Sequence, residues 1–155
     1  MSKRTYKSQV GAIPKIVNNF KPKTLNQRVF HDIISEEDTQ LVLCHGIAGT
    51  GVVALIEGKN PNKRIVGLRA DMDALPIFEA NEIDYKSKNE GIMHACGHDV
   101  HTTSLLGTAK ILFKLKAEFE GSIKFVFQPA EEKAPGGASI MIKEGVLDNP
   151  KPVSM

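Results

Sequence analysis

The sequence contains no tryptophan and only two cysteines among its 155 residues, Cys44 and Cys96. So few cysteines argue against a disulfide-stabilised scaffold and favour reduced thiols, so we expect a cytoplasmic protein. Long hydrophobic runs are also missing, since the longest aliphatic stretch covers only 52–56, against the ~20 residues that a membrane helix needs. The basic N-terminus is followed by no apolar segment, and we expect no secretory signal there.

A strong excess of charge of one sign is missing as well. Lysine and arginine number 20, and aspartate and glutamate number 18, which leaves a formal net charge of +2. This balance gives no electrostatic reason to expect nucleic acid or an anionic membrane as a partner. With 41% hydrophobic and 25% charged residues, the composition is typical of a globular domain with a buried core.

From residue 45 onward the sequence alternates between strand and helix patterns. Strands are expected in three segments: 52–57, 64–70 and 122–127. Turn-forming residues at 58–63 separate the first two strands, which predicts an antiparallel hairpin over 52–70. Apolar residues at helical spacing predict a helix over 101–119, and a pair of glycines introduces a shorter helix over 138–143. This order predicts an α/β fold, a mixed sheet with flanking helices.

The N-terminal part carries weaker patterns. At most a short helix, interrupted by proline, is expected over 8–20, and Ser35 resembles a helix cap followed by acidic residues. The glycines of 45–51 precede a strand and lack the lysine followed by serine or threonine of a phosphate-binding loop, so we expect them to serve backbone geometry. Cys44 and His45 are a weak candidate for a ligand pair, because adjacent side chains diverge.

The densest group of reactive side chains lies just before the longer expected helix. It places three of the five histidines close together with a thiol and a carboxylate: His94, Cys96, His98, Asp99 and His101. In an extended segment Cys96 and His98 point to the same side, and thiolate and imidazole are both good zinc ligands. The other three are candidates for further ligands or for groups that orient them. Alternatively, Cys96 is a small buried residue or a reactive thiol, and the histidines cap the helix.

Two carboxylate pairs follow expected strands. Glu131 and Glu132 come after 122–127, where one can bind a metal while the other serves as a base; the alternative is an exposed acidic turn. Asp71 and Asp73 follow 64–70 and lie on one side of an extended segment. They are candidates for a metal ligand or for an orienter of a ligand histidine, and the alternative is a solvated loop cap.

Three segments together resemble one enzyme family. GLRADMDALPI (67–77), MHACGHDVHT (93–102) and FQPAEEKAPGGA (127–138) are similar to motifs of the amidohydrolase branch of the aminoacylase and carboxypeptidase-like metallopeptidases. That branch includes indole-acetyl-amino-acid hydrolases, hippurate hydrolases and N-acyl-amino-acid deacylases. The resemblance extends from about His45 to Met155, and the motifs occur in the family's order and spacing.

The resemblance implies a site and an activity. It implies a dinuclear centre, usually of manganese or zinc, with Cys96, His98 and Glu132 as ligands, and two further histidines from later in a full-length enzyme. Glu131 corresponds to the general base and acid, and Asp73 to the aspartate that supports the site. The implied reaction is metal-dependent hydrolysis of the amide bond of an N-acyl or N-acetyl amino acid, a small-molecule substrate.

The sequence also departs from the family pattern. It stops near the expected third ligand, has no lid or dimerisation domain, and lacks the usual histidine-proline-glutamate opening. We therefore expect residues 45–155 to form the N-terminal part of an incomplete zinc-peptidase-like catalytic domain, preceded by a divergent segment over 1–44. An exposed sheet edge predicts a homo-oligomer. Two alternative functions stay open: a truncated, non-catalytic metal-binding fragment, and a thiol hydrolase with Cys96 as its nucleophile.

Overall fold

The computed structural model describes residues 41–42 and 51–155. The expected helix over 8–20, the cap at Ser35 and the ligand pair Cys44 and His45 lie outside the described residues. Within them, no helix combines the length and the apolar character needed to cross a membrane.

The centre of the structure is a four-stranded mixed sheet with the spatial order β1-β2-β4-β3. Its strands are β1 (Leu41–Val42), β2 (Val52–Glu57), β3 (Ile65–Asp71) and β4 (Ser122–Gln128). β1 and β4 run antiparallel to β2, whereas β3 runs parallel to β4. The predicted α/β class with a mixed sheet is confirmed, and the short β1 is an addition that the sequence patterns did not predict.

The predicted hairpin over 52–70 is wrong. β2 and β3 are consecutive in the chain, but β4 lies between them and pairs with both. The reason is the burial of β4, in which Phe125 and Phe127 pack on one face while Val126 packs on the other. A strand that is buried on both faces is most stable in the interior of the sheet. The local turn pattern of 58–63 carries no information about which strand, β3 or β4, pairs with β2.

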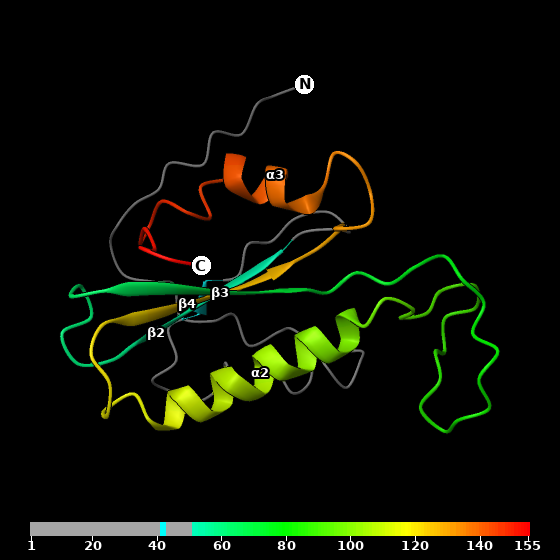
Figure 1. Cartoon of the computed structure of the whole chain (residues 1–155), viewed down its shortest axis with the longest axis horizontal. Coiled ribbons are helices and arrows are strands. Elements are labelled where there is room, and N and C mark those ends of the chain that lie inside the picture. The colour runs from blue at the N-terminus through cyan, green and yellow to red at the C-terminus, as the bar shows by residue number, and fades with distance from the viewer. Residues whose placement is uncertain (1–40, 43–50) are drawn as a thin grey trace, which may run out of the picture.

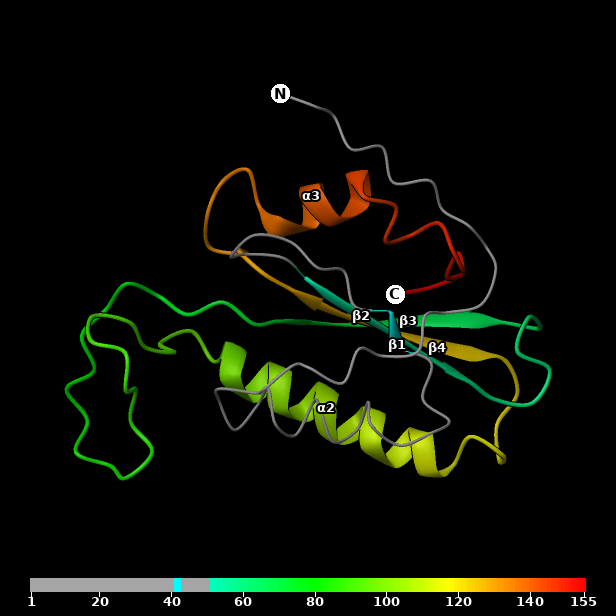
Figure 2. The same ribbon diagram turned by 180° about the vertical axis from the view of Figure 1, so that it is seen from behind.

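Within the described residues, two helices cover opposite faces of the sheet, so this part of the fold has three layers (Figures 1 and 2). α2 (His98–Lys114) packs Leu105, Leu106 and Ala109 into the larger core, which contains Phe125 with 0% of its surface exposed. α3 (Gly137–Lys143) contributes Met141 to a smaller core on the other face. Burial of these apolar side chains is the main contribution that holds the two helices against the sheet.

α2 begins three residues earlier than predicted, at His98 instead of His101, and it also ends earlier, at Lys114 instead of 119. Gly97, which immediately precedes it, has a φ of 90°, a backbone conformation that glycine adopts without steric cost. The chain therefore turns sharply between Cys96 and His98. The expectation of an extended segment at this point was wrong, and His98 belongs to the first turn of the helix.

The parallel pairing of β3 and β4 brings their carboxyl ends to the same edge of the sheet, with Asp71 in register with Gln128. Both strands continue into the segments that carry the acidic pairs. The N-terminal part of α2 lies nearby, and Thr102 Oγ1 there donates a hydrogen bond to the carbonyl of Asp71 at 2.8 Å. Loops at the carboxyl ends of such strands are the usual location of binding sites in α/β folds.

β3 lies at one edge of the sheet, and the C-terminal residues pair with part of it. The amide of Val153 donates to the carbonyl of Ile65 at 2.8 Å, and the amide of Gly67 donates to the carbonyl of Ser154 at 2.8 Å. Among the described residues, no strand continues this pairing along the outer side of β3 toward Asp71. A homo-oligomer formed through this edge stays a prediction.

Candidate metal centre

Three segments that are far apart in the sequence meet at the carboxyl edge of the sheet. They contribute Asp73 after β3, Cys96 and His98 at the start of α2, and Glu132 after β4. One ligand atom from each of Cys96, His98 and Glu132 lies within 4.8 Å of the others. His98 is buried, with 4% of its surface exposed, while Cys96 and Glu132 are open to solvent. We call these three residues the thiol cluster.

Asp73 connects the three segments. Its Oδ2 accepts a hydrogen bond from the backbone amide of Glu132 at 3.1 Å, and its Oδ1 lies 3.3 Å from Nδ1 of His98. Burial raises the pKa of Asp73, but hydrogen bonds from the backbone amides of Glu132 and Glu131, together with the charge of His98, hold that pKa below its ordinary value. The carboxylate of Asp73 therefore stays ionised.

The ring of His98 is oriented by the same aspartate. Nδ1 of His98 lies 3.1 Å from the backbone carbonyl of Asp73. A carbonyl only accepts hydrogen bonds, so Nδ1 is the ring nitrogen that donates to it, and Nε2 is the nitrogen left for another partner. Nε2 is also the nitrogen that faces Glu131, whose Oε2 is 3.9 Å away. Metal-ligating histidines are held in this way, with the second ring nitrogen donating to a backbone carbonyl or a carboxylate.

The Glu131–Glu132 pair is positioned by an unusual turn. Ala130 has a φ of 48°, a conformation that costs a residue with a Cβ about 1–3 kcal/mol and that is found most often at functional sites. The carbonyl of Ala130 accepts a hydrogen bond from the amide of Gly137 at 2.9 Å, just inside α3. At this turn the chain leaves the direction of β4, and Glu132 comes to lie near Cys96 and His98.

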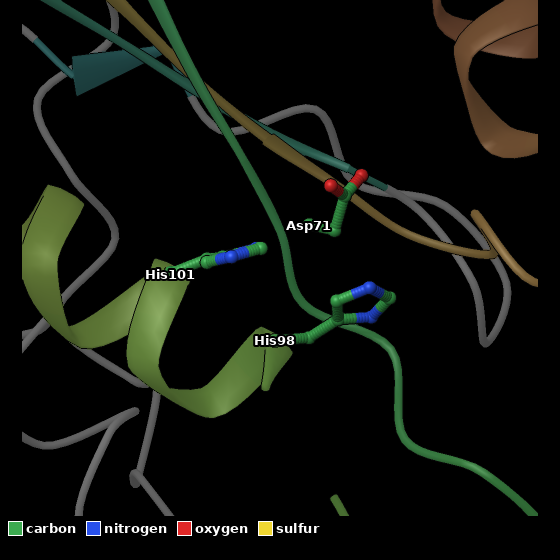
Figure 3. Close-up of side chains that lie close together, drawn as sticks. All are labelled: Asp71, His98 and His101. Atoms are coloured by element: carbon green, nitrogen blue, oxygen red, sulfur yellow. The ribbon is translucent and has the colours of Figure 1, made fainter. Parts of the chain in front are cut away.

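A second group of ligand atoms lies beside the first. Asp71, His98 and His101 also bring one ligand atom each within 4.8 Å of the others, and we call them the histidine cluster. Figure 3 shows the two histidines, from the first turn of α2, next to Asp71 at the end of β3. The two histidine rings are 5.8 Å apart, measured between centroids. Both clusters contain His98.

Asp71 and Asp73 have different partners, although the sequence placed them on one side of an extended segment. Asp71 is buried and forms an ion pair through Oδ1 with Nη2 of Arg69. Asp73 instead contacts His98 and the backbone of Glu132. The positive charge of Arg69 already compensates the first carboxylate, whereas Oδ1 of Asp73 is buried without a hydrogen-bond partner among the described residues.

The donor chemistry of the thiol cluster fits a divalent transition metal. A thiolate, an imidazole and a carboxylate are the ligands from which zinc sites are built. The buried Oδ1 of Asp73 lies near Nδ1 of His98 but lacks a hydrogen-bond partner among the described residues, and a bound ion is one of the explanations for such an oxygen. The predicted ligands Cys96, His98 and Glu132 thus lie together, and Asp73 and Glu131 both contact His98.

The surroundings of Cys96 disfavour its thiolate form. A hydrogen bond with the side chain of Glu132, partial desolvation and the surrounding carboxylates of Glu132, Glu131 and Asp73 all raise the pKa of Cys96. Nucleophilic cysteines lie in electropositive surroundings that have the opposite effect. This geometry argues against the thiol hydrolase alternative, and it leaves metal coordination as the use of Cys96 that its neighbours support.

Not every candidate joins the site. His94 and Asp99 are exposed and belong to neither cluster formed by the described residues. Sequence reasoning missed Arg69 and Gln128, whose side chains meet at 2.6 Å between Nε and Oε1. The available signal was an arginine two positions before Asp71 in a strand, because residues two apart share a face.

Comparison with known proteins shows the family of the chain. The sequence profile of peptidase family M20/M25/M40 matches residues 67–155. The chain is 56% identical over 99 residues to the N-acyl-L-amino acid amidohydrolase of Geobacillus stearothermophilus, covering 64% of this chain and 26% of that protein. It is 53% identical over 102 residues to the hippurate hydrolase of Campylobacter jejuni, covering 66% and 26%.

A solved structure is similar as well. The Bacillus subtilis YXEP protein, described as a dinuclear metal binding peptidase from the M20 family, superposes with a TM-score of 0.66 at 40% identity, covering 79% of this chain and 33% of that one. The fold and the site thus define an α/β metallopeptidase-like domain. The chain belongs to peptidase family M20/M25/M40. It spans about a quarter of the length of the curated relatives named above.

Proposed function

We propose that this chain is the N-terminal part of the catalytic domain of a metal-dependent amidohydrolase that cleaves the amide bond of N-acyl or N-acetyl amino acids. One observation carries the proposal: Cys96 and His98, at the start of α2, lie together with Glu132, which follows β4, and Glu131 is beside the same histidine. Family membership and relatives named as N-acyl amino acid and hippurate hydrolases support it.

The ligands of the proposed site are Cys96, His98 and Glu132, and the proposed metal is zinc or manganese. A thiolate favours zinc among these, since manganese prefers oxygen ligands. When bound, a divalent metal supplies a Lewis acid that polarises a carbonyl and makes water more acidic. The intact enzyme would hold two ions, by analogy with the dinuclear YXEP protein.

Glu131 is the proposed general base and acid. It accepts the proton of the water that attacks the acyl carbon and returns this proton to the nitrogen of the departing amino acid. Its position supports that role, because Oε2 lies near His98 while the adjacent Glu132 takes the place in the thiol cluster. Asp73 has a positioning role, since its carboxylate lies beside Nδ1 of His98 and accepts a hydrogen bond from the backbone amide of Glu132.

The proposed function also implies two segments of the chain, a kind of partner and a cellular compartment. Residues 45–155 would form the catalytic part, which contains the segment that the family profile matches, and residues 1–44 would be a divergent N-terminal segment. A small N-acyl amino acid is the proposed partner, and neither nucleic acid nor membrane is expected to bind. A cytoplasmic setting fits the exposed free thiol of Cys96, because that ligand must stay reduced.

Metal analysis tests the ligand assignment. We expect the dialysed protein to retain bound zinc or manganese, and Cys96→Ser to lose most of it, because the thiolate is a principal donor. Ser104→Ala, at an exposed position of α2, is the control for substitution as such. Equal metal content in Cys96→Ser and the parent protein would refute the assignment.

Turnover tests the reaction. Hydrolysis of N-acetyl amino acids and of hippurate would be followed by release of the free amino acid in the presence of zinc or manganese. Glu131→Gln is expected to lower the rate about 100-fold or more without lowering metal content, whereas Glu118→Gln, an exposed glutamate after α2, leaves both unchanged. Bound metal without turnover in the parent chain would select the alternative function, a non-catalytic metal-binding fragment.

A further inference from the structure

Arg69 lies where it can control both ligand clusters. In β3 it shares a face with Asp71, two residues further along, and Asp71 is in register with Gln128 of β4. The guanidinium donates through Nε to Oε1 of Gln128 at 2.6 Å and through Nη2 to Oδ1 of Asp71. It therefore ties the carboxyl ends of the two strands together directly before the turns that carry Asp73 and Glu131.

The histidine cluster would be a competent metal site without this arginine. Two histidines one helical turn apart and a carboxylate from a neighbouring strand form a donor set that several divalent transition metals accept. The two clusters compete, because both require His98 and its Nδ1 is already bound to the carbonyl of Asp73. Only Nε2 is free for a metal, so His98 serves one cluster at a time.

Arg69 makes that competition unequal. Asp71 is 8% exposed, so water contributes little to the solvation of its carboxylate. The negative charge of this carboxylate is instead compensated by a guanidinium with fixed positive charge. A divalent ion that binds Asp71 would have to share the carboxylate with this guanidinium, which pairs with Oδ1. The ion would then lie beside a fixed positive charge, which is unfavourable in a poorly solvated position. The thiol cluster contains no such cation among its contacts in the described residues.

We infer that Arg69 is a positioning residue that withholds Asp71 from metal coordination and so directs the ion to Cys96, His98 and Glu132. The inference rests on the proposed metal site and adds the selection between its two candidate positions. It assigns a role to an arginine that does not itself contact a ligand atom of the thiol cluster. Removal of the guanidinium should move the metal toward Asp71 and His101, away from the thiolate.

Cobalt(II) is a suitable probe, because a cobalt–thiolate bond gives a near-ultraviolet charge-transfer band that imidazole and carboxylate ligands do not give. In the reduced full chain we expect this band in the parent protein. Arg69→Met should keep its bound cobalt, measured by elemental analysis, and lose most of the band per bound ion. Arg69→Met combined with Asp71→Asn should regain the band, since the competing carboxylate is then gone.

Two further variants separate charge from shape. Arg69→Lys keeps a positive charge beside Asp71 but loses the fork that also reaches Gln128, and we expect it to keep the band. Arg64→Met makes the same substitution as the main variant at an exposed arginine just before β3, and we expect the parent spectrum. Circular dichroism melting curves of all variants show whether each retains the fold.

The outcomes are distinct. An unchanged band in folded Arg69→Met overturns the role of Arg69, and so does a lost band that Asp71→Asn fails to restore. If Arg69→Met does not fold, Arg69→Lys and Asp71→Asn decide, because the inference requires the parent band in both. Bound cobalt without any thiolate band in the parent protein would instead refute the metal assignment itself, and the role of Arg69 with it.

Discussion

The two ends of the β3–β4 pair are built in opposite ways. At the amino end, backbone groups before β4 are hydrogen-bonded to backbone groups after β2. The amide of Gly58 donates to the carbonyl of Gly121 at 2.9 Å, and the amide of Gly121 donates to the carbonyl of Lys59 at 2.7 Å. The charged groups there, Lys63 and Glu120, pair with each other in solvent. At the carboxyl end, buried and half-buried polar side chains meet from three segments, and Oδ1 of Asp73 has no hydrogen-bond partner among the described residues.

This difference shows how one pair of strands serves both stability and chemistry. Among the described residues, the amino end pairs its polar groups with the protein's own backbone and with each other, and neither ligand cluster lies there. The carboxyl end leaves a thiol, an imidazole nitrogen and carboxylates incompletely satisfied, and such groups are those that a metal can bind. The comparison predicts that substitutions at the two ends have separable effects, while substitutions in the shared core affect both.

The largest effect is expected from the core that both ends share. Phe125 is completely buried in the central strand β4, and Phe125→Ala should lower the free energy of unfolding by about 3–5 kcal/mol. Urea denaturation followed by circular dichroism measures it, since the chain has no tryptophan. Ile111→Ala, at an exposed position of α2, is the control, and comparable losses in the two variants would contradict the assigned core.

The amino end should be sensitive to backbone shape. Gly121 has a φ of 87°, and a Cβ placed on it would lie 2.2 Å from the carbonyl oxygen of Arg64. Gly121→Ala should therefore cost about 1–3 kcal/mol of stability and leave the metal content of the folded protein unchanged. Gly107→Ala is the matched substitution, because nothing lies within 4 Å of that position in α2, and there alanine should be neutral or stabilising.

The carboxyl end should respond in metal affinity. Asp73→Asn removes the charge that orients His98 and should weaken metal binding about tenfold, as measured by competition with a chromophoric chelator. Asp84→Asn, in the exposed loop before the site, is the control. Equal affinity in the two variants would show that Asp73 does not support the site.

The same variant tests a pH effect in the metal-free protein. The pKa of Asp73 is lower in the fold than its ordinary value. Its ionised form therefore contributes stability above that ordinary value, near pH 4, and the contribution disappears as the pH falls through the lowered pKa. Asp73→Asn should thus lose less stability than the parent between neutral pH and the acid range. Parallel acid unfolding curves of the two proteins would contradict the lowered pKa.

The smallest effect is expected from the exposed ion pair of the amino end. The side chain of Lys63 is 63% exposed and that of Glu120 is 46% exposed. Ion pairs as exposed as this one contribute roughly 0–1 kcal/mol to the free energy of unfolding. Lys63→Met should therefore change the unfolding free energy by less than about 1 kcal/mol, and high salt should reduce the difference further. Metal content should not change, and a loss of metal would show that the two ends are coupled.

Local patterns were sufficient for most elements of the fold. The strand at 52–57 was placed with its observed limits, and the strands at 64–70 and 122–127 and the helix at 138–143 lie within one residue of theirs. The pairing of the strands was not accessible, because a turn pattern reports on neighbours in sequence and not on the burial of β4. The predicted start of α2 is too late, because His98 was assigned to an extended segment that carries site residues, whereas it also belongs to the first turn of the helix.

Residue types and spacing by themselves determined the α/β class and a wider set of candidates, since ligand chemistry depends on the side chain alone. The resemblance of three sequence motifs to the amidohydrolase branch then selected Cys96, His98, Glu131, Glu132 and Asp73 from that set. Only the tertiary structure decided which groups meet. It separated Asp71 from Asp73 by giving the first an arginine partner, and it placed both ligand clusters on one histidine. The physical reason is that these contacts join segments up to about 60 residues apart, and the packing of β3 against β4 and α2, which no local pattern encodes, sets their distances.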